Sequence, residues 1–208
     1  MQKALASLAV CLSLAACAST GTHAPVAYMA PGEAAASAEP STAVTPSIPA
    51  AQATGYFIEF RARSALSYGH TFAVHGRLNA QQEIIESTVV GLHPRGDSPV
   101  PWMIGHVIPV PSETSASDGD TENEYITARF RLILNESEYK GLLAYIRELE
   151  ASSPMWHAAF YNCNMYVQQI AKHLGLRTPF TIWLKPKAFI TKLGELNHKR
   201  ALVASAAP

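Results

Sequence analysis

The sequence is poor in cysteine, in net charge and in long apolar runs. Its 208 residues include 3 cysteines, and 16 Lys and Arg residues balance 16 Asp and Glu residues, so the formal net charge is zero. Nucleic-acid-binding domains need a basic surface, so we expect no nucleic-acid partner. Beyond the N-terminal apolar stretch, no run approaches the roughly 18 residues that a transmembrane helix requires. We therefore expect no membrane-spanning helix in the rest of the chain.

The N-terminus has a charged start and then a short apolar stretch. Lys3 is followed by residues 4–16, which are mostly alanine and leucine. This layout is typical of a secretory signal and is too short to span a bilayer comfortably. The stretch ends in Leu14-Ala15-Ala16-Cys17, which resembles the lipobox of bacterial lipoproteins. The resemblance implies that residues 1–16 are a removed signal peptide and that lipid is attached to Cys17.

The lipobox resemblance also implies a location in the cell. Ala18, and not an aspartate, follows Cys17. Under the sorting rule of Gram-negative bacteria, this places the protein on the outer membrane, facing the periplasm, with the lipid anchor as its membrane contact. The alternative is an ordinary secretory signal with an incidental cysteine.

Residues 17–54 do not have the composition of a folded segment. They are rich in alanine, proline, serine and threonine and show no apolar periodicity. Such a segment cannot bury enough surface to offset its ordering entropy, so we expect a disordered tether. A tether of this length would hold the domain about 30–40 Å from its anchor. Residues 55–197 then form one domain of ordinary size, and we expect residues 198–208 to be a flexible tail.

The pattern within this domain predicts an α+β fold. Alternating or β-branched segments predict strands at 55–63, 68–78, 84–93, 103–110 and 125–134. Asn135 and Glu138 have the spacing of a helix capping box, and we expect further helices from Asn162 to Gly175 and over 187–196. Four to five mostly antiparallel strands followed by two to three helices make an α+β domain.

Cys163 is the candidate nucleophile. Cys11 leaves with the signal and Cys17 carries the lipid, so Cys163 has no partner for an intramolecular disulfide in an oxidising compartment. Asn162 predicts a helix start there, and the free N–H groups of a first helical turn favour a thiolate. The alternative is that Cys163 is a buried small apolar side chain.

His70 is the candidate general base. A polar turn at residues 79–82 would pair His70 with Gly91 and place it on the same face as Phe72, Val74 and His93. Because this face is apolar, we expect it to be the core face on which the Cys163 helix packs. The alternative for His70 is a satisfied core histidine, and His93 is alternatively a residue that ends its strand before proline.

The order of these motifs resembles a known family. A strand opened by Gly69-His70 precedes a helix opened by Asn162-Cys163. This order is similar to that of the circularly permuted NlpC-type papain-like hydrolases, which include the lecithin–retinol acyltransferase-like proteins. The resemblance covers residues 56–175 and implies a permuted papain-like fold. It also implies Cys163 as nucleophile, His70 as general base and His93 as the third group that orients the base.

The activity implied by this resemblance is acyl transfer. His70 would take the thiol proton, Cys163 would attack an amide or ester carbonyl, and water or another acceptor would release the thioester. Peptidoglycan stem peptides and lipid acyl groups are the substrate classes within reach of an envelope-anchored domain. The histidine spacing matches no compact zinc pattern, so we expect no metal or other cofactor. The alternative is a noncatalytic envelope lipoprotein that uses the same fold for binding or scaffolding.

Overall fold

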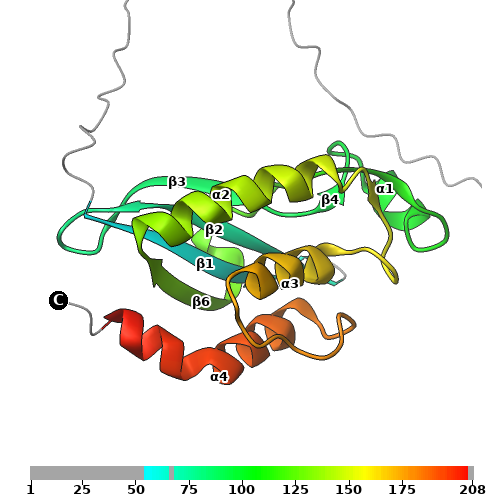
Figure 1. The fold of residues 1–208 in the computed structure, drawn as a ribbon. Coiled ribbons are helices and arrows are strands. Elements are labelled where there is room, and N and C mark those ends of the chain that lie inside the picture. The colour runs from blue at the N-terminus through cyan, green and yellow to red at the C-terminus, as the bar shows by residue number, and fades with distance from the viewer. Residues whose placement is uncertain (1–53, 66–67, 206–208) are drawn as a thin grey trace, which may run out of the picture. The chain divides into compact units, whose positions relative to one another are not determined.

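Two antiparallel sheets and four α-helices form the part of the chain that the computed structural model describes, residues 54–65 and 68–205 (Figure 1). The larger sheet has the order β3-β2-β1-β6, with β1 (Gly55–Arg63), β2 (His70–Leu78), β3 (Ile84–Val90) and β6 (Ile126–Leu134). The smaller sheet has the order β4-β5-β7, with β4 (His93–Pro94), β5 (Val110–Glu113) and β7 (Met155–Trp156). This arrangement confirms the α+β fold class.

The four α-helices are α1 (Pro99–Ile104), α2 (Glu136–Ala151), α3 (Cys163–His173) and α4 (Pro186–Ser205), and a 3-10 turn, η2 (Asn123–Tyr125), precedes β6. Three of the four α-helices, α1, α2 and α3, follow a residue whose side chain caps them. The predicted capping box of α2 is present, because Asn135 and Glu138 each accept a hydrogen bond from the other's backbone N–H. Asn162 Oδ1 accepts from Met165 N at 3.1 Å, so α3 begins at Cys163 as predicted.

The main core lies between the larger sheet and three helices. Helices α2, α3 and α4 all lie on one side of this sheet (Figure 1). The sheet contributes inward-facing side chains such as Ile58, Phe60 and Ala73, and the helices contribute Leu142, Ile170 and Phe189, among others. Fully burying an aliphatic or aromatic side chain of this size contributes ~1.5–3 kcal/mol, so this layer is the main source of stability.

The opposite face of the larger sheet carries a smaller cluster that includes Phe57, Phe72 and Val74. Along β2, Thr71, Ala73 and His75 face the helices, whereas His70, Phe72 and Val74 point the other way. The prediction that the His70 face packs against the Cys163 helix is therefore wrong. Because β2 is buried on both faces, its apolar residues do not reveal which face the helices cover.

The observed register between β2 and β3 also differs from the predicted one. Val74 pairs with Val89 and Ala73 with Val90, so an extension of this register would place His70 opposite His93 and not opposite Gly91. The difference is an even number of residues, so each side chain keeps its predicted neighbours on the same face. His93 itself lies in β4 of the smaller sheet, but the predicted proximity of His70 and His93 is confirmed.

Two other predicted elements differ from the structure. Residues 103–110 do not form a strand. Helix α1 and a following turn occupy most of this range, because the Ser98 side chain accepts from Val100 N and Pro99 starts the helix. The predicted tail at 198–208 is also wrong over most of its length, since α4 continues to Ser205 past an irregular residue, Asn197.

Residues 1–53 lie outside the described residues. The signal peptide, the lipidated Cys17 and the tether therefore remain predictions. Within the described ranges, no helix is both long and apolar enough to span a bilayer.

Candidate functional site

A cavity of about 990 Å³ opens where β2 begins. Its walls come from the start of β2 and the residues before it, from α1, and from the segment between β5 and β6. His70 and His93, two of the three residues predicted for catalysis, line this cavity, whereas Cys163 does not.

Glycine at position 69 sets the direction in which the chain enters β2. Gly69 has a φ of +93°, and a Cβ at this position would lie 2.6 Å from the carbonyl oxygen of Arg63. Only glycine fits this close approach without strain. The tight entry fixes His70 as the first residue of β2, directly at the cavity wall.

His70 is almost fully buried, with 1 % of its surface exposed, and neither ring nitrogen has a hydrogen-bond partner. Burial lowers the pKa of His70 to about 4; the nearby Asp120 carboxylate opposes this shift, whereas Arg63 and His93 add to it. The ring is therefore neutral at pH 7, with one nitrogen as a donor and the other as an acceptor.

The Asp120 carboxylate lies close to His70 but is already paired. Its Oδ2 atom is 3.8 Å from His70 Nε2, which is too long for a hydrogen bond. Arg63 Nε donates to Asp120 Oδ1 at 2.6 Å, and Ser117 donates to Oδ2 from both its backbone N–H and its hydroxyl. Asp120 thus holds the loop before β6 over the end of the sheet. Sequence reasoning missed this residue, although the Ser-x-x-Asp spacing was a local signal for it.

His93 lies beside His70 without a hydrogen bond between them. The two ring centroids are 6.1 Å apart, and the rings meet edge to face at 88°. The His93 nitrogens lie 3.0 Å from Pro94 O and 3.2 Å from Ser115 O. The predicted hydrogen bond through which His93 would orient His70 is not formed.

Trp102 of α1 completes an aromatic wall of the cavity. Its ring is nearly parallel to that of His93, with centroids 6.5 Å apart, and is edge-on to His70 at 6.2 Å. No local pattern indicated this role, because Trp102 lies in a segment predicted to precede a strand. Such aromatic packing fixes the orientation of both imidazoles.

Cys163 is the first residue of α3 and is 5 % exposed. Burial raises the pKa of its thiol, and hydrogen bonds with Thr71 and with backbone N–H groups at the helix start only partly oppose this shift. The N–H groups at the helix start do favour the thiolate, as predicted, but the net shift of the thiol pKa is upward and not downward. In this structure the desolvation of the sulfur outweighs the stabilising N–H groups.

A polar cluster ties the start of α3 to the chain before α4. Thr71 Oγ1 donates to Asn164 Oδ1 at 3.0 Å, and Asn164 Nδ2 donates at 2.8 Å to the carbonyl oxygens of Ile182 and Leu184. Tyr68 also donates to Leu184 O, at 3.2 Å. These bonds satisfy the buried amide of Asn164, so its role here is structural.

Tyr68 connects the surroundings of Cys163 with the cavity. It lines the cavity, and its hydroxyl is close enough to Cys163 for the sulfur, together with burial, to raise the pKa of Tyr68. A phenol with a raised pKa is not a base at neutral pH. Tyr68 therefore lies near both the cavity and the thiol but does not act as a base for Cys163.

The structure does not join His70 to Cys163 by a hydrogen bond. The His70 nitrogens have no partner, and the neighbour of Cys163 on β2 is Thr71, whose side chain points to the opposite face from that of His70. The three predicted catalytic residues thus divide into a pair, His70 and His93, at the cavity and a buried thiol on the helix-covered face.

No metal centre is formed by the part of the chain that the structure describes, since no three His, Cys, Asp or Glu side chains are grouped closely enough to hold an ion. Comparison with protein-family models, with curated proteins and with solved structures finds no match to this chain.

Proposed function

We propose that this domain binds a small ligand in the cavity around His70, and that binding is its main function. The observation that carries this proposal is the pair of unpartnered ring nitrogens on a buried histidine in the cavity wall. A buried polar group without a partner costs ~1–3 kcal/mol. A ligand that forms a hydrogen bond with one of these nitrogens would recover part of this energy.

The shape and lining of the cavity agree with this proposal. Its volume, about 990 Å³, is at the upper end of the range of small-molecule sites. Trp102, Tyr68 and Tyr125 supply aromatic surface, and His70 supplies a polar group fixed in orientation. The lining also carries Arg63 and four carboxylates, those of Asp97, Glu113, Asp118 and Glu122, so the cavity combines aromatic surface with charged groups.

Titration calorimetry on the chain from residue 18 tests the proposal. The probes are a soluble peptidoglycan stem peptide and a short-chain acyl ester, which represent the two substrate classes expected at the envelope. One of them should bind with a Kd at or below about 1 mM. His70→Phe should weaken that binding at least about tenfold, because the ring loses its polar contacts.

His198→Phe is the matched control, since it makes the same change at an exposed position outside the cavity lining. It should leave the affinity unchanged. Absence of binding for both probes, or equal affinities of His70→Phe and the parent chain, would contradict a ligand site at His70.

A second candidate function is acyl transfer by Cys163, as the resemblance to the permuted papain-like hydrolases implies. The observation in its favour is the position of Cys163 at the start of a helix capped by Asn162. The step requires a base, so the side chain of His70 would have to reach the other face of β2. The anchored location implied by Cys17 remains part of both proposals.

The rate of alkylation by iodoacetamide separates the two functions. A catalytic thiol reacts at neutral pH faster than a model thiol and slows in His70→Ala. If Cys163 reacts no faster than the model thiol and His70→Ala has no effect, acyl transfer is excluded and ligand binding is left.

A further inference from the structure

Helix α1 carries an apolar stripe on its outer side. Val100, Met103, Ile104, Val107 and Ile108 are all exposed, and their spacing is that of one face of a helix. The helical turn continues past α1, since Ile108 N donates to Ile104 O at 3.1 Å. No residue of α1 is buried. The apolar side chains of α1 therefore face outward, whereas an ordinary surface helix turns its apolar face towards the core.

A second group of exposed apolar side chains lies next to this stripe. Phe160 precedes α3, whereas Phe180 and Trp183 lie between α3 and α4, where Trp183 is 72 % exposed. Backbone and side-chain hydrogen bonds connect the two groups: Ala158 N donates to Gly105 O at 3.0 Å, and Trp183 Nε1 donates to Ala159 O at 3.1 Å. Figure 1 shows these segments at the same end of the domain.

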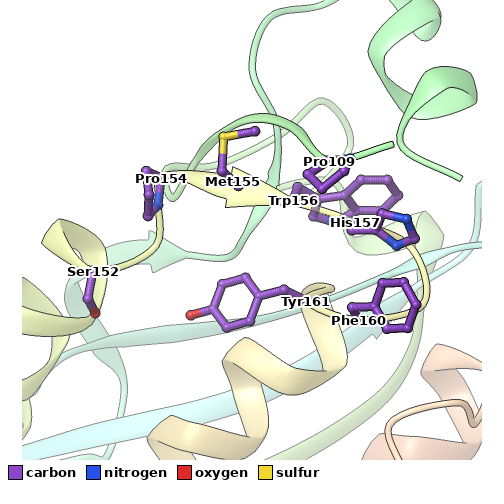
Figure 2. Close-up of a pocket in the computed structure, with 8 residues that line it drawn as sticks. All are labelled: Pro109, Ser152, Pro154, Met155, Trp156, His157, Phe160 and Tyr161. Carbon is purple, nitrogen blue, oxygen red and sulfur yellow. The ribbon is translucent and has the colours of Figure 1, made fainter. Parts of the chain in front are cut away.

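A small pocket of about 290 Å³ lies within this region (Figure 2). Pro109, Met155, Trp156 and Phe160 form much of its lining. We call the whole surface the apolar end, and we define it by nine exposed residues: Val100, Met103, Ile104, Val107, Ile108, Met155, Phe160, Phe180 and Trp183. Among the described residues, the other large exposed apolar or aromatic side chains are Tyr68, Ile84 and Tyr125.

Within the segments that form the apolar end, the charged side chains are of one sign, whereas Asp97 and Glu113 line the neighbouring cavity together with Met103. Residues 98–111 contain no Asp, Glu, Lys or Arg, and residues 151–194 contain basic residues but no Asp or Glu. Arg177, Lys185 and Lys187 are exposed beside Phe180 and Trp183 in the sequence. The surface therefore combines an uncharged apolar helix with a basic flank.

We propose that the apolar end docks on a lipid bilayer that contains anionic headgroups. Contiguous apolar surface of this extent marks an interaction site. An apolar helix face with a tryptophan beside it can insert about 5–10 Å into the interface of a bilayer. The basic flank complements anionic headgroups, which favours a membrane over an apolar protein partner. The predicted anchor at Cys17 would keep the bilayer within reach of the domain.

Vesicle co-sedimentation tests this proposal. The chain from residue 18 retains every described residue and lacks the predicted signal and lipid site, so any binding comes from the protein surface. It should bind vesicles of phosphatidylglycerol and phosphatidylcholine more tightly than vesicles of phosphatidylcholine alone. Brominated lipids in the vesicles should quench the fluorescence of Trp183, and Trp183→Phe should remove that part of the quenching.

Val107→Glu is the decisive variant, because this side chain is 80 % exposed and its replacement leaves the core intact. It should weaken vesicle binding at least tenfold. Ile84→Glu is the matched control, since it changes an exposed apolar side chain on β3, outside the apolar end, and should bind as the parent chain does.

Three results would overturn the proposal. One is the absence of binding to both kinds of vesicle. Another is equal binding by Val107→Glu and the parent chain. The last is a self-association, seen by sedimentation velocity without lipid, that Val107→Glu abolishes; this would assign the apolar end to a second copy of the chain.

Discussion

The buried imidazole of His70 makes the stability of the domain dependent on pH. Its pKa of about 4 in the folded protein lies below the value near 6.5 of an unfolded chain. Between these values the unfolded chain binds a proton that the folded chain does not, so stability is present above pH 6.5 and falls as the pH drops towards 4. The full loss from this residue is of the order of 3 kcal/mol.

Urea unfolding at pH 7 and at pH 4.5 measures this effect. His70→Gln should reduce the difference in unfolding free energy between the two pH values, because glutamine does not titrate. His75 is also buried with a lowered pKa, so His75→Gln should remove a separate part of the difference. An unchanged pH dependence in His70→Gln would show that the imidazole is not buried in solution.

At the scale of single residues, the sequence predicted some neighbours and missed others. The proximity of His70 and His93 was predictable, because alternation along paired strands depends only on local pattern. The pairing of Asp120 with Arg63 was not, since it brings a loop back to a strand far away in the sequence. The pKa of Cys163 was predicted in the wrong direction, because burial depends on tertiary packing.

At the scale of elements, the Asn162 cap joins two segments. Its Oδ1 accepts from Met165 N, and its Nδ2 donates to Ala158 O at 2.7 Å. Asn162→Ala removes both bonds and should lower the unfolding free energy by ~1–2 kcal/mol, whereas Asn162→Asp keeps the cap and should cost less. Urea denaturation of the two variants and the parent chain measures this. Equal stabilities of Asn162→Ala and the parent chain would show that the cap does not contribute.

Local signals explain which elements could be predicted. The starts of α2 and α3 were predicted correctly, because a capping side chain acts within one turn of its helix. Helix α1 was not predicted, because Val107 and Ile108, which follow it directly, have strand propensity and made the segment 103–110 resemble a strand. Two other signals in this segment indicate a helix: its Ser98-Pro99 start and the i, i+3, i+4 spacing of its apolar residues.

At the scale of the whole domain, the C-terminal part of α4 is a structural element. Arg200 donates to Leu174 O at 2.6 Å and to Glu138 Oε1 at 3.0 Å, and Asn197 bonds both the N–H and the carbonyl of Arg177. Truncation after residue 196 removes Asn197 and Arg200 and should therefore lower the unfolding free energy by ~1–3 kcal/mol, whereas truncation after residue 205 keeps both residues and should not. Thermal unfolding of both chains measures this, and an unchanged midpoint in the shorter one would restore the tail interpretation.

The packing of the whole domain also explains why Cys163 lies on the opposite face of β2 from His70. A strand covered on both faces gives the same apolar pattern whichever face the helices cover, so β2 alone could not show on which side α3 packs. That choice depends on β1, whose Ile58, Phe60 and Ala62 share the helix-covered face. The four strands of the larger sheet and the helices α2 and α3 were therefore predictable, whereas the side of the sheet on which His70 lies relative to Cys163 was not.

Helix α1 belongs to two surfaces: Trp102 and Met103 line the cavity, and Met103 is also part of the exposed stripe that continues to Val107. A molecule bound on either side therefore changes the energy of the same few side chains. If bilayer docking moves α1 and alters ligand affinity by some factor, thermodynamic linkage requires the ligand to alter the affinity for the bilayer by the same factor. The affinity of the cavity for its ligand would then change when the domain docks on the bilayer. A bound ligand would in turn change how long the domain stays on the bilayer.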